Sequence, residues 1–396
     1  MRTSQLAGCV ARYASRLHSA VGDGHHVASP LGAWLLVAVA APASAGPDRA
    51  TLTGVLGCDI DTAAAAAAAL LGDPHPEVAS AAAAWTAPQA SFTDTFREWE
   101  RGLPPQVETG DLPDQAGLDA WVREHTLGLI TKAPVDWTPD LFFVLASALA
   151  TRVSWQVPFT LVPAAELGEA SPWSRRLRHV LRAPNHGHRA FIAATDEAGD
   201  VAVHVAQAQH GLQVYSVAAA PAVPSGPVLA AAHEIACANA VGAAVARRRL
   251  TDLPLGTGPA WVLREEASSA GGDVCTAVLP AWSAQSELDL SSQGLGFELV
   301  KNALVPDPCP WQARQSAMAR YSRTGFEAAA ATMFAVAASA RLPGRRRVAD
   351  LRFGHPYAVV AVAVDGPQQW QGVPVFSAWV ADPSDATDDD PAQAGL

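Results

Sequence analysis

The chain has 396 residues, which is long for an average domain but within the range of a single large one. Apolar residues make up 49% and charged residues 16%, so a sizeable core can be buried and general disorder is excluded. The formal net charge of -11 excludes the overall basic surface that attracts nucleic acid or anionic lipid. We therefore expect no nucleic-acid partner and no membrane partner.

The N-terminal residues have an amphipathic pattern. Their apolar side chains recur at helical spacing, at Leu6, Cys9, Val10, Tyr13 and Leu17. This pattern predicts a helix rather than a signal peptide. The most apolar stretch, residues 31–41, is too short to span a bilayer. We expect a cytoplasmic protein, or one that is secreted without a recognisable signal peptide.

The first half of the chain is predicted to be mostly helical. Ser29 is a plausible N-cap and Pro30 a plausible first residue of a buried helix that runs to residue 41. Further on, Asp61 is expected to cap an alanine-rich helix over residues 62–71. Another helix is expected within residues 114–131.

The second half is predicted to be rich in strands. The candidates lie within residues 141–155, 201–218 and 273–279, and a C-terminal hairpin pairs residues 357–364 with 373–380. Both hairpin strands are apolar on both faces, which places them inside a packed sheet. Helices followed by strands, without an internal repeat or a break in composition, predict one α+β domain with a mixed sheet.

Metal and cofactor sites are not indicated. The five cysteines (Cys9, Cys58, Cys237, Cys275 and Cys309) are widely spaced and include no CxxC pair, so neither a disulfide framework nor a zinc knuckle is predicted. His25-His26 and His186-Gly187-His188 have no carboxylate or cysteine at zinc-motif spacing, so loop histidines are expected there. No nucleophile elbow, P-loop or dinucleotide fingerprint occurs, so an enzyme is not supported.

Residues 325–347, GFEAAAATMFAVAASARLPGRRR, form an unusual segment. Alanine favours a helix, so a buried alanine-rich helix followed by a loop is one interpretation. If the segment is extended, one uncharged face contains Phe326, Ala328, Ala330, Thr332, Phe334 and Val336. A segment with such a face is able to enter a sheet as an additional strand.

Several short motifs occur in order along the chain. They are Ser29-Pro30-Leu31, LTGVLG at 52–57, VLASALATRVSWQVPF at 144–159, Val278-Leu279-Pro280, GFEAAAAT at 325–332, His355-Pro356-Tyr357 and Val380-Ala381-Asp382-Pro383. In this order they resemble motifs of the serpin family, with only a loose match over residues 160–270. The resemblance suggests a bacterial member of the family.

The resemblance implies an α+β serpin fold, with helices on a large central mixed sheet. It implies one domain over residues 1–383, an exposed reactive loop over 325–347 and an acidic disordered tail over 384–396. The resemblance also implies a mechanism, in which a serine-type protease cuts the loop as it forms an acyl-enzyme and the freed loop enters the sheet and traps the protease. The inhibitor itself supplies no catalytic group. We expect a monomer without cofactors, and a non-inhibitory binding or scaffold protein is the alternative.

The hinge of the reactive loop corresponds to Gly325, Phe326, Glu327, Ala328, Ala329, Ala330, Ala331 and Thr332. Four positions depart from the family pattern. Phe326 replaces a small residue, and its bulk is expected to slow insertion. Arg323 and Thr324 replace an acidic pair, and Ser147 replaces a strand asparagine.

Two peptide bonds are candidates for the bond that the protease cuts. Counting from Gly325 gives Ser339–Ala340, which suits a subtilisin- or elastase-like protease. Counting back from His355-Pro356 gives Arg341–Leu342, which suits a trypsin-like protease. The arginines at 345–347 are either a surface that steers an acidic protease or a solvated run.

Overall fold

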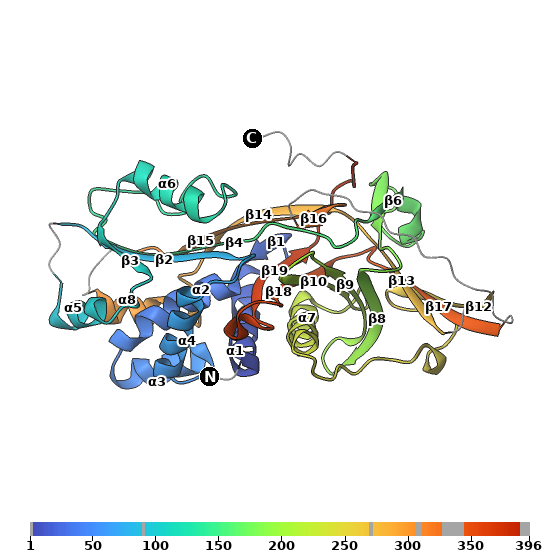
Figure 1. Ribbon diagram of the computed structural model, residues 1–396, viewed down its shortest axis with the longest axis horizontal. Coiled ribbons are helices and arrows are strands. Elements are labelled where there is room, and N and C mark those ends of the chain that lie inside the picture. The colour runs from blue at the N-terminus through green and yellow to red at the C-terminus, as the bar shows by residue number, and fades with distance from the viewer. Residues whose placement is uncertain (1–2, 89–91, 269–271, 306–310, 327–343, 389–396) are drawn as a thin grey trace.

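The computed structural model describes residues 3–88, 92–268, 272–305, 311–326 and 344–388. The described helices are α1 (Thr3–Val21), α2 (Pro30–Ala40), α3 (Gly46–Leu56), α4 (Ile60–Gly72), α5 (Asp94–Arg101), α6 (Gln115–His125), α7 (Ser225–Ala240) and α8 (Phe297–Leu304). Helices α2, α3 and α4 lie in the left half of Figure 1, and α1 lies nearer the centre beside α7, which packs beneath the strands there. The predicted N-terminal helix is therefore confirmed.

Local capping explains where these helices begin. The Ser29 hydroxyl accepts a hydrogen bond from Gly32 N at 3.2 Å, and every residue of α2 is buried, as the sequence predicted. Helix α4 begins two residues earlier than expected, because Asp59 rather than Asp61 accepts from Thr62 N at 2.8 Å. Helix α6 ends at His125, within the predicted range.

A six-stranded sheet forms the centre of the core. Its order is β1 (His26–Ala28), β19 (Pro374–Val380), β18 (Tyr357–Ala363), β10 (Leu212–Ala218), β9 (Gly199–Gln207) and β8 (His188–Thr195). Strands β18 and β19 pair antiparallel and are buried along their whole length. The predicted C-terminal hairpin and its interior position are confirmed.

A second six-stranded sheet lies at the opposite end of the molecule from α3 and α4 (Figure 1). Its order is β11 (Gly256–Thr257), β12 (Trp261–Ser268), β17 (Gly344–Arg352), β13 (Val274–Leu279), β7 (His179–Arg182) and β6 (Thr160–Pro163). Strand β17 is an interior strand, antiparallel to β12 over eight residue pairs and parallel to β13. The β11–β12 hairpin was not predicted from the sequence.

The remaining strands form a long layer across the top of Figure 1. It contains a three-stranded sheet, β3 (Val107–Asp111), β2 (Ala79–Thr86) and β4 (Phe143–Ala150), and two pairs, β14 (Trp282–Asp289) with β15 (Arg314–Tyr321) and β16 (Gly325–Phe326) with β5 (Val153–Ser154). Helix α6 covers β2 and β4. Strand β2 is alanine-rich, but its eight-residue pairing with β4 overrides the helical preference of alanine.

The beginning of the acidic C-terminal segment is bound to the protein. Ser384 forms a β-bridge with Ala281, and Ala386 N donates to His179 O at 3.1 Å with only 3% of Ala386 exposed. The expectation of a disordered tail over 384–396 is therefore wrong for residues 384–388, because these backbone contacts and the ion pair of Asp388 with Arg323 hold them in place. Residues 389–396 lie outside the described residues.

Two further expectations concern cysteines and membranes. The four cysteines within the described residues are free thiols. Among the described helices, none is by itself long and apolar enough to cross a membrane, whereas α3 and α4, bent by 53°, reach that length and composition as a pair.

Candidate functional site

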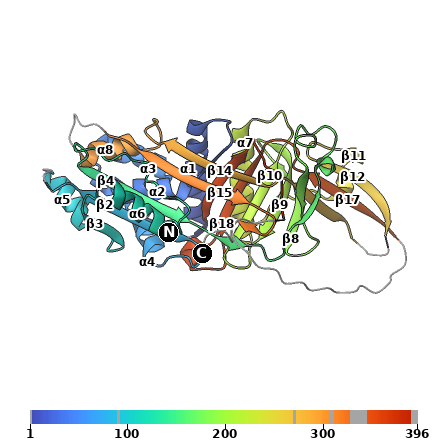
Figure 2. The ribbon, with the colours of Figure 1, turned by 90° about the horizontal axis from the view of Figure 1, so that it is seen from above.

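Strands β4 and β15 lie side by side but belong to different sheets among the described residues (Figure 2). Three cavities follow the seam between them. The upper cavity (about 10 Å³) is bordered by Leu149 and Ala319, the middle one (about 90 Å³) by Ser147 and Gln315, and the lower one (about 140 Å³) by Leu145 and Ala313. We call this seam, from Ala150 and Ala319 down to Phe143 and Ala313, the slot. Among the described residues, no strand lies in the slot between β4 and β15.

The walls of the slot are mainly apolar. Leu36 and Phe376 border it from the core side, and Trp121 and Ile130 border the middle cavity from helix α6 and the segment that follows α6. In the lower cavity, side chains of α8 form one wall. A strand that entered the slot would therefore bury one face on the core and the other beneath α6.

The beginning of the predicted hinge lies at the top of the slot. After β15 the chain turns back, and Ser322 N donates to Gly325 O at 3.0 Å. Strand β16 then pairs antiparallel with β5, with Gly325 opposite Ser154 and Phe326 opposite Val153. The chain thus leaves Phe326 running back in the direction opposite to β15.

Phe326 is already buried, with 5% of its surface exposed. Its ring lies edge-on to Trp282, with 6.4 Å between the ring centres, and it borders the upper cavity. The sequence placed Gly325 and Phe326 on an exposed loop, but their pairing with β5 puts both in a strand. At the other end of that loop, residues 344–347 belong to β17, where they pair with β12. The segment between the two strands is thus residues 327–343.

Aromatic side chains hold this turn against the core. The indole N–H of Trp155 donates to Ser322 O at 3.0 Å, and its backbone N–H donates to Thr324 O at 2.9 Å. The Trp155 ring lies 5.0 Å from Tyr321, which stacks in turn on Trp282. Burial raises the pKa of the Tyr321 hydroxyl well above its usual value, so it is neutral.

A polar cluster crosses the middle of the slot. Ser29 N donates to Gln315 Oε1, and Gln315 Nε2 donates to Ser29 O, both at 2.9 Å. On the other side of the slot, Ser147 Oγ donates to Gly32 O at 3.1 Å. The N-terminus of α2 is therefore bonded to β15 and to β4. Sequence analysis noted Ser147 but missed Gln315, whose only signal was its place in a strand pattern.

Arg323 contacts the C-terminal segment. Its guanidinium lies 3.5 Å from a carboxylate oxygen of Asp388. Arg323, where the family has an acidic residue, therefore forms an ion pair with Asp388, the last described residue of the chain.

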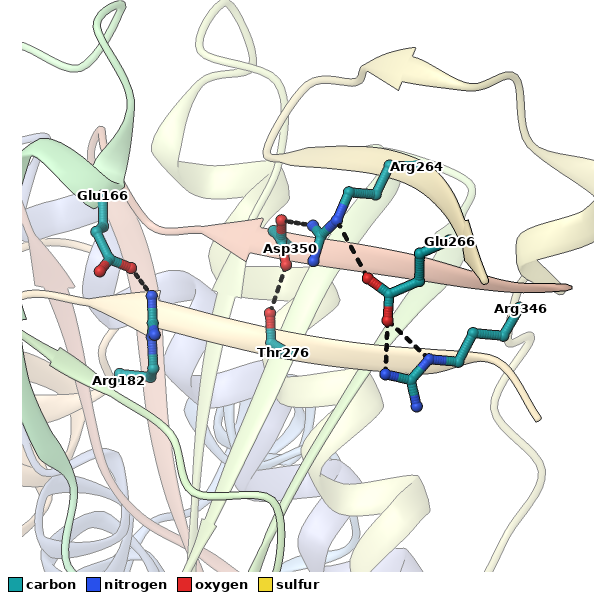
Figure 3. A network of polar contacts seen from close by, with 7 residues as sticks. All are labelled: Glu166, Arg182, Arg264, Glu266, Thr276, Arg346 and Asp350. Atoms are coloured by element: carbon teal, nitrogen blue, oxygen red, sulfur yellow. Dashed lines mark hydrogen bonds and ion pairs between the residues drawn. The ribbon is translucent and has the colours of Figure 1, made fainter. Parts of the chain in front are cut away.

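The arginine cluster at 345–347 is paired with acidic residues of β12, and Figure 3 shows the pair of Arg346 with Glu266. Arg346 donates twice to Glu266 Oε1, at 2.6 and 2.9 Å, and Arg345 donates to Glu265 Oε2 at 3.0 Å. Arg347 donates to Leu250 O at 2.7 Å. Arg346 and Arg347 are therefore partly buried and paired, which contradicts a free steering surface or a solvated run for these two, whereas 83% of the Arg345 side chain stays exposed.

The other site residues lie outside the described residues. These are the hinge positions Glu327, Ala328, Ala329, Ala330, Ala331 and Thr332 and the bond candidates Ser339, Ala340, Arg341 and Leu342. Their roles stay predictions. Among the described residues no group of three or more histidine, cysteine or acidic side chains is placed to hold a metal ion.

No family model and no curated protein matches the chain. Solved structures do match over almost its whole length. Human thyroxine-binding globulin complexed with thyroxine has a TM-score of 0.63 at 12% identity, covering 96% of this chain and 100% of that one. The thermophilic serpin tengpin in its native state has a TM-score of 0.64 at 12% identity, covering 96% and 94%.

Serpin48 of the insect Tenebrio molitor, described as highly specific, has a TM-score of 0.60 at 17% identity, covering 95% of this chain and 97% of that one. These neighbours include both serpins and a thyroxine-binding globulin, so they establish the architecture and not the activity. The predicted fold is confirmed: this chain has the serpin fold.

Proposed function

We propose that this chain inhibits a serine-type protease by suicide-substrate trapping. The observation that carries the proposal is the slot, which opens directly below the strand where the reactive loop begins. A protease would form an acyl-enzyme at the loop and cut it, and the free loop would enter the slot behind Phe326. The protease, still attached through its own serine, would be carried along and deformed.

The geometry of β16 gives this insertion a defined register. Continued pairing beyond Phe326 and Val153 would place Thr332 opposite Ser147, across the middle cavity. Phe326 is buried, so the residues that alternate with it, including Ala330, would face the core. Small side chains suit that face because the cavities along the slot are narrow. The sequence thus supplies alanine and threonine for the upper and middle slot, and the larger Phe334 and Val336 would lie at the wider lower cavity.

The experiment that tests this proposal mixes the protein with trypsin and, separately, with subtilisin or elastase. We expect an SDS-stable covalent band with one protease, and the mass of the released C-terminal peptide will identify Ser339–Ala340 or Arg341–Leu342 as the cut bond. The cleaved protein is expected to melt at a higher temperature than the intact one. Clean cutting without the band would disprove trapping.

A pair of variants separates insertion from simple recognition by the protease. Ala330→Asp puts a charge on the face that would be buried, so it is expected to abolish the covalent band and leave cutting intact. Ala329→Asp, its matched control, puts the same charge on the opposite face, toward Leu129 and Ile130, which are only partly buried, so it should retain more of the band. Equal loss with both variants would argue against the register.

A non-inhibitory binding or scaffold protein is the second candidate. Phe326 favours it, because this large side chain already fills the top of the slot and fixes the first hinge residues to β5. A scaffold of this kind would be cut without trapping the protease and would gain no thermal stability on cleavage.

A further inference from the structure

Two histidines lie directly beneath residues 155–159, the segment that holds the base of the loop. His188 on β8 and His204 on β9 face each other, with Nδ1 of His188 3.1 Å from Nε2 of His204. Phe159 packs on both rings, at 4.6 Å from His188 and 5.5 Å from His204 between ring centres. His204 is fully buried and His188 is partly buried on β8, so the expectation of exposed loop histidines is wrong for His188, as it is for His26, which is buried in β1.

The same segment is bonded to the turn that leads into β16. His188 Nε2 contacts Val157 O at 2.7 Å, and Phe159 N donates to Arg323 O at 2.9 Å. Trp155, four residues earlier, donates to Thr324 O. Residues 155–159 therefore lie between the histidine pair and the base of the loop. A change in the pair thus alters residues 155–159 and, through them, the base of the loop.

The hydrogen bonds fix the neutral form of the pair. A carbonyl only accepts, so His188 Nε2 carries the hydrogen toward Val157 O, and His188 Nδ1 accepts from His204 Nε2–H. His204 Nδ1 is then a bare acceptor, and it has no hydrogen-bond partner among the described residues. One added proton leaves either two N–H groups facing each other or a buried N–H of His204 without an acceptor, and both are costly.

Solvent protons can reach the histidine pair through a neighbouring cavity, and no free carboxylate beside the pair stabilises its protonated form. Both histidines border a cavity of about 400 Å³ between β8, β9 and the second six-stranded sheet. The charged and titratable side chains that face them are His186, Arg189, Arg264, Glu266, Cys275, Tyr321 and Arg346. The one carboxylate among them, Glu266, is already held by Arg264 and Arg346 (Figure 3).

We propose that the His188–His204 pair is an acid-sensitive latch, whose protonation loosens residues 155–159 and releases β16 at the base of the loop. Release of β16 does not depend on the proposed function. Only its consequence, faster loop insertion at acid pH, rests on that function. Burial lowers the pKa of His188 to about 4 and that of His204 well below its usual value. The closed latch thus binds fewer protons than the open one, and closure weakens as the pH falls below about 6.5.

Amide hydrogen exchange measured by mass spectrometry tests the latch without any protease. After correction for chemical exchange, the opening of peptides that cover residues 153–159 and 321–326 should rise about tenfold from about pH 7.5 to about pH 5.5 through His188 alone. The β18–β19 hairpin should stay protected. A rise that is equal in all peptides, or absent from these two, would overturn the latch even if no variant folds.

The variant His188→Gln/His204→Gln keeps the chain of donors and acceptors but does not titrate, so its two peptides should show no acid response. His26→Gln removes a buried imidazole elsewhere and serves as the matched control, which should respond like the unmodified protein. A persistent response in the double variant would contradict the latch. Failure to trap a protease would disprove the inhibitor and leave this result unaffected.

Discussion

Ser29 and Gln315 lie 286 positions apart in the sequence and exchange two hydrogen bonds of 2.9 Å. One is the N-cap of the buried helix α2, and the other is on β15, at the edge of the slot. The contact ties the edge of the slot to the core, so the two halves of the layer are held through α2 rather than by direct pairing of β4 and β15.

Replacing Gln315 by leucine is expected to destabilise the protein. The change leaves Ser29 N and O without their partner, which costs about 1–3 kcal/mol of unfolding free energy. Chemical denaturation will measure it. The matched control is Gln285→Leu on the exposed face of β14, for which a change within about 0.5 kcal/mol is expected. Equal stability of the two variants would contradict the role of Gln315.

The ion pairs between β12 and β17 lead to a prediction about salt. Glu266→Gln removes the carboxylate shared by Arg264 and Arg346, which should cost about 0.5–1 kcal/mol at low ionic strength. The side chains are about a quarter to a half exposed, so screening should reduce the effect in concentrated sodium chloride. Glu287→Gln on the exposed face of β14 is the control. An effect that does not depend on salt would argue for a packing role instead.

The sequence predicted those parts of the fold where local pattern and tertiary structure agree. Helix α2 has its serine cap and a wholly apolar run, and β18 and β19 are apolar on both faces. The alanine-rich strand β2 was missed, because its strand state comes from pairing with β4 and not from local preference.

The candidate site was predictable in its hinge but not in its surroundings. Residues 325–332 were identified from composition and family resemblance. The slot, the contact of Gln315 with Ser29 and the pairing of β12 with β17 all depend on which distant segments meet, and a single sequence carries little of that information.

A second histidine cluster predicts a general loss of stability in acid. His18 Nδ1 lies 2.7 Å from His26 Nε2 and its Nε2 lies 2.6 Å from Ser377 Oγ, while the His233 ring is 5.9 Å away. Burial lowers the pKa of all three imidazoles, that of His233 to about 4. Their stabilising effect is complete above about pH 6.5 and is lost as the pH falls toward the folded-state value.

For His233 alone, unfolding free energy should fall by about 1.4 kcal/mol between about pH 7.5 and about pH 5.5. Denaturation of His233→Gln at both values should show a smaller drop than the unmodified protein. His210→Gln, an exposed histidine, is the control and should show the full drop. If His233→Gln and the control lose the same amount, this cluster does not govern acid stability.

The C-terminal segment is expected to contribute to stability up to Asp388. Truncation after Pro383 removes the buried Ala386, the hydrogen bonds of Asp385 with Arg178 and the ion pair between Asp388 and Arg323. The loss should be about 1–3 kcal/mol, because two backbone bonds and two exposed ion pairs disappear together. Truncation after Asp388 leaves all of these contacts and should leave the melting temperature unchanged. If both truncations behave alike, the bound segment does not stabilise the fold. A loss that appears only with truncation after Pro383 would establish that residues 384–388 stabilise the fold.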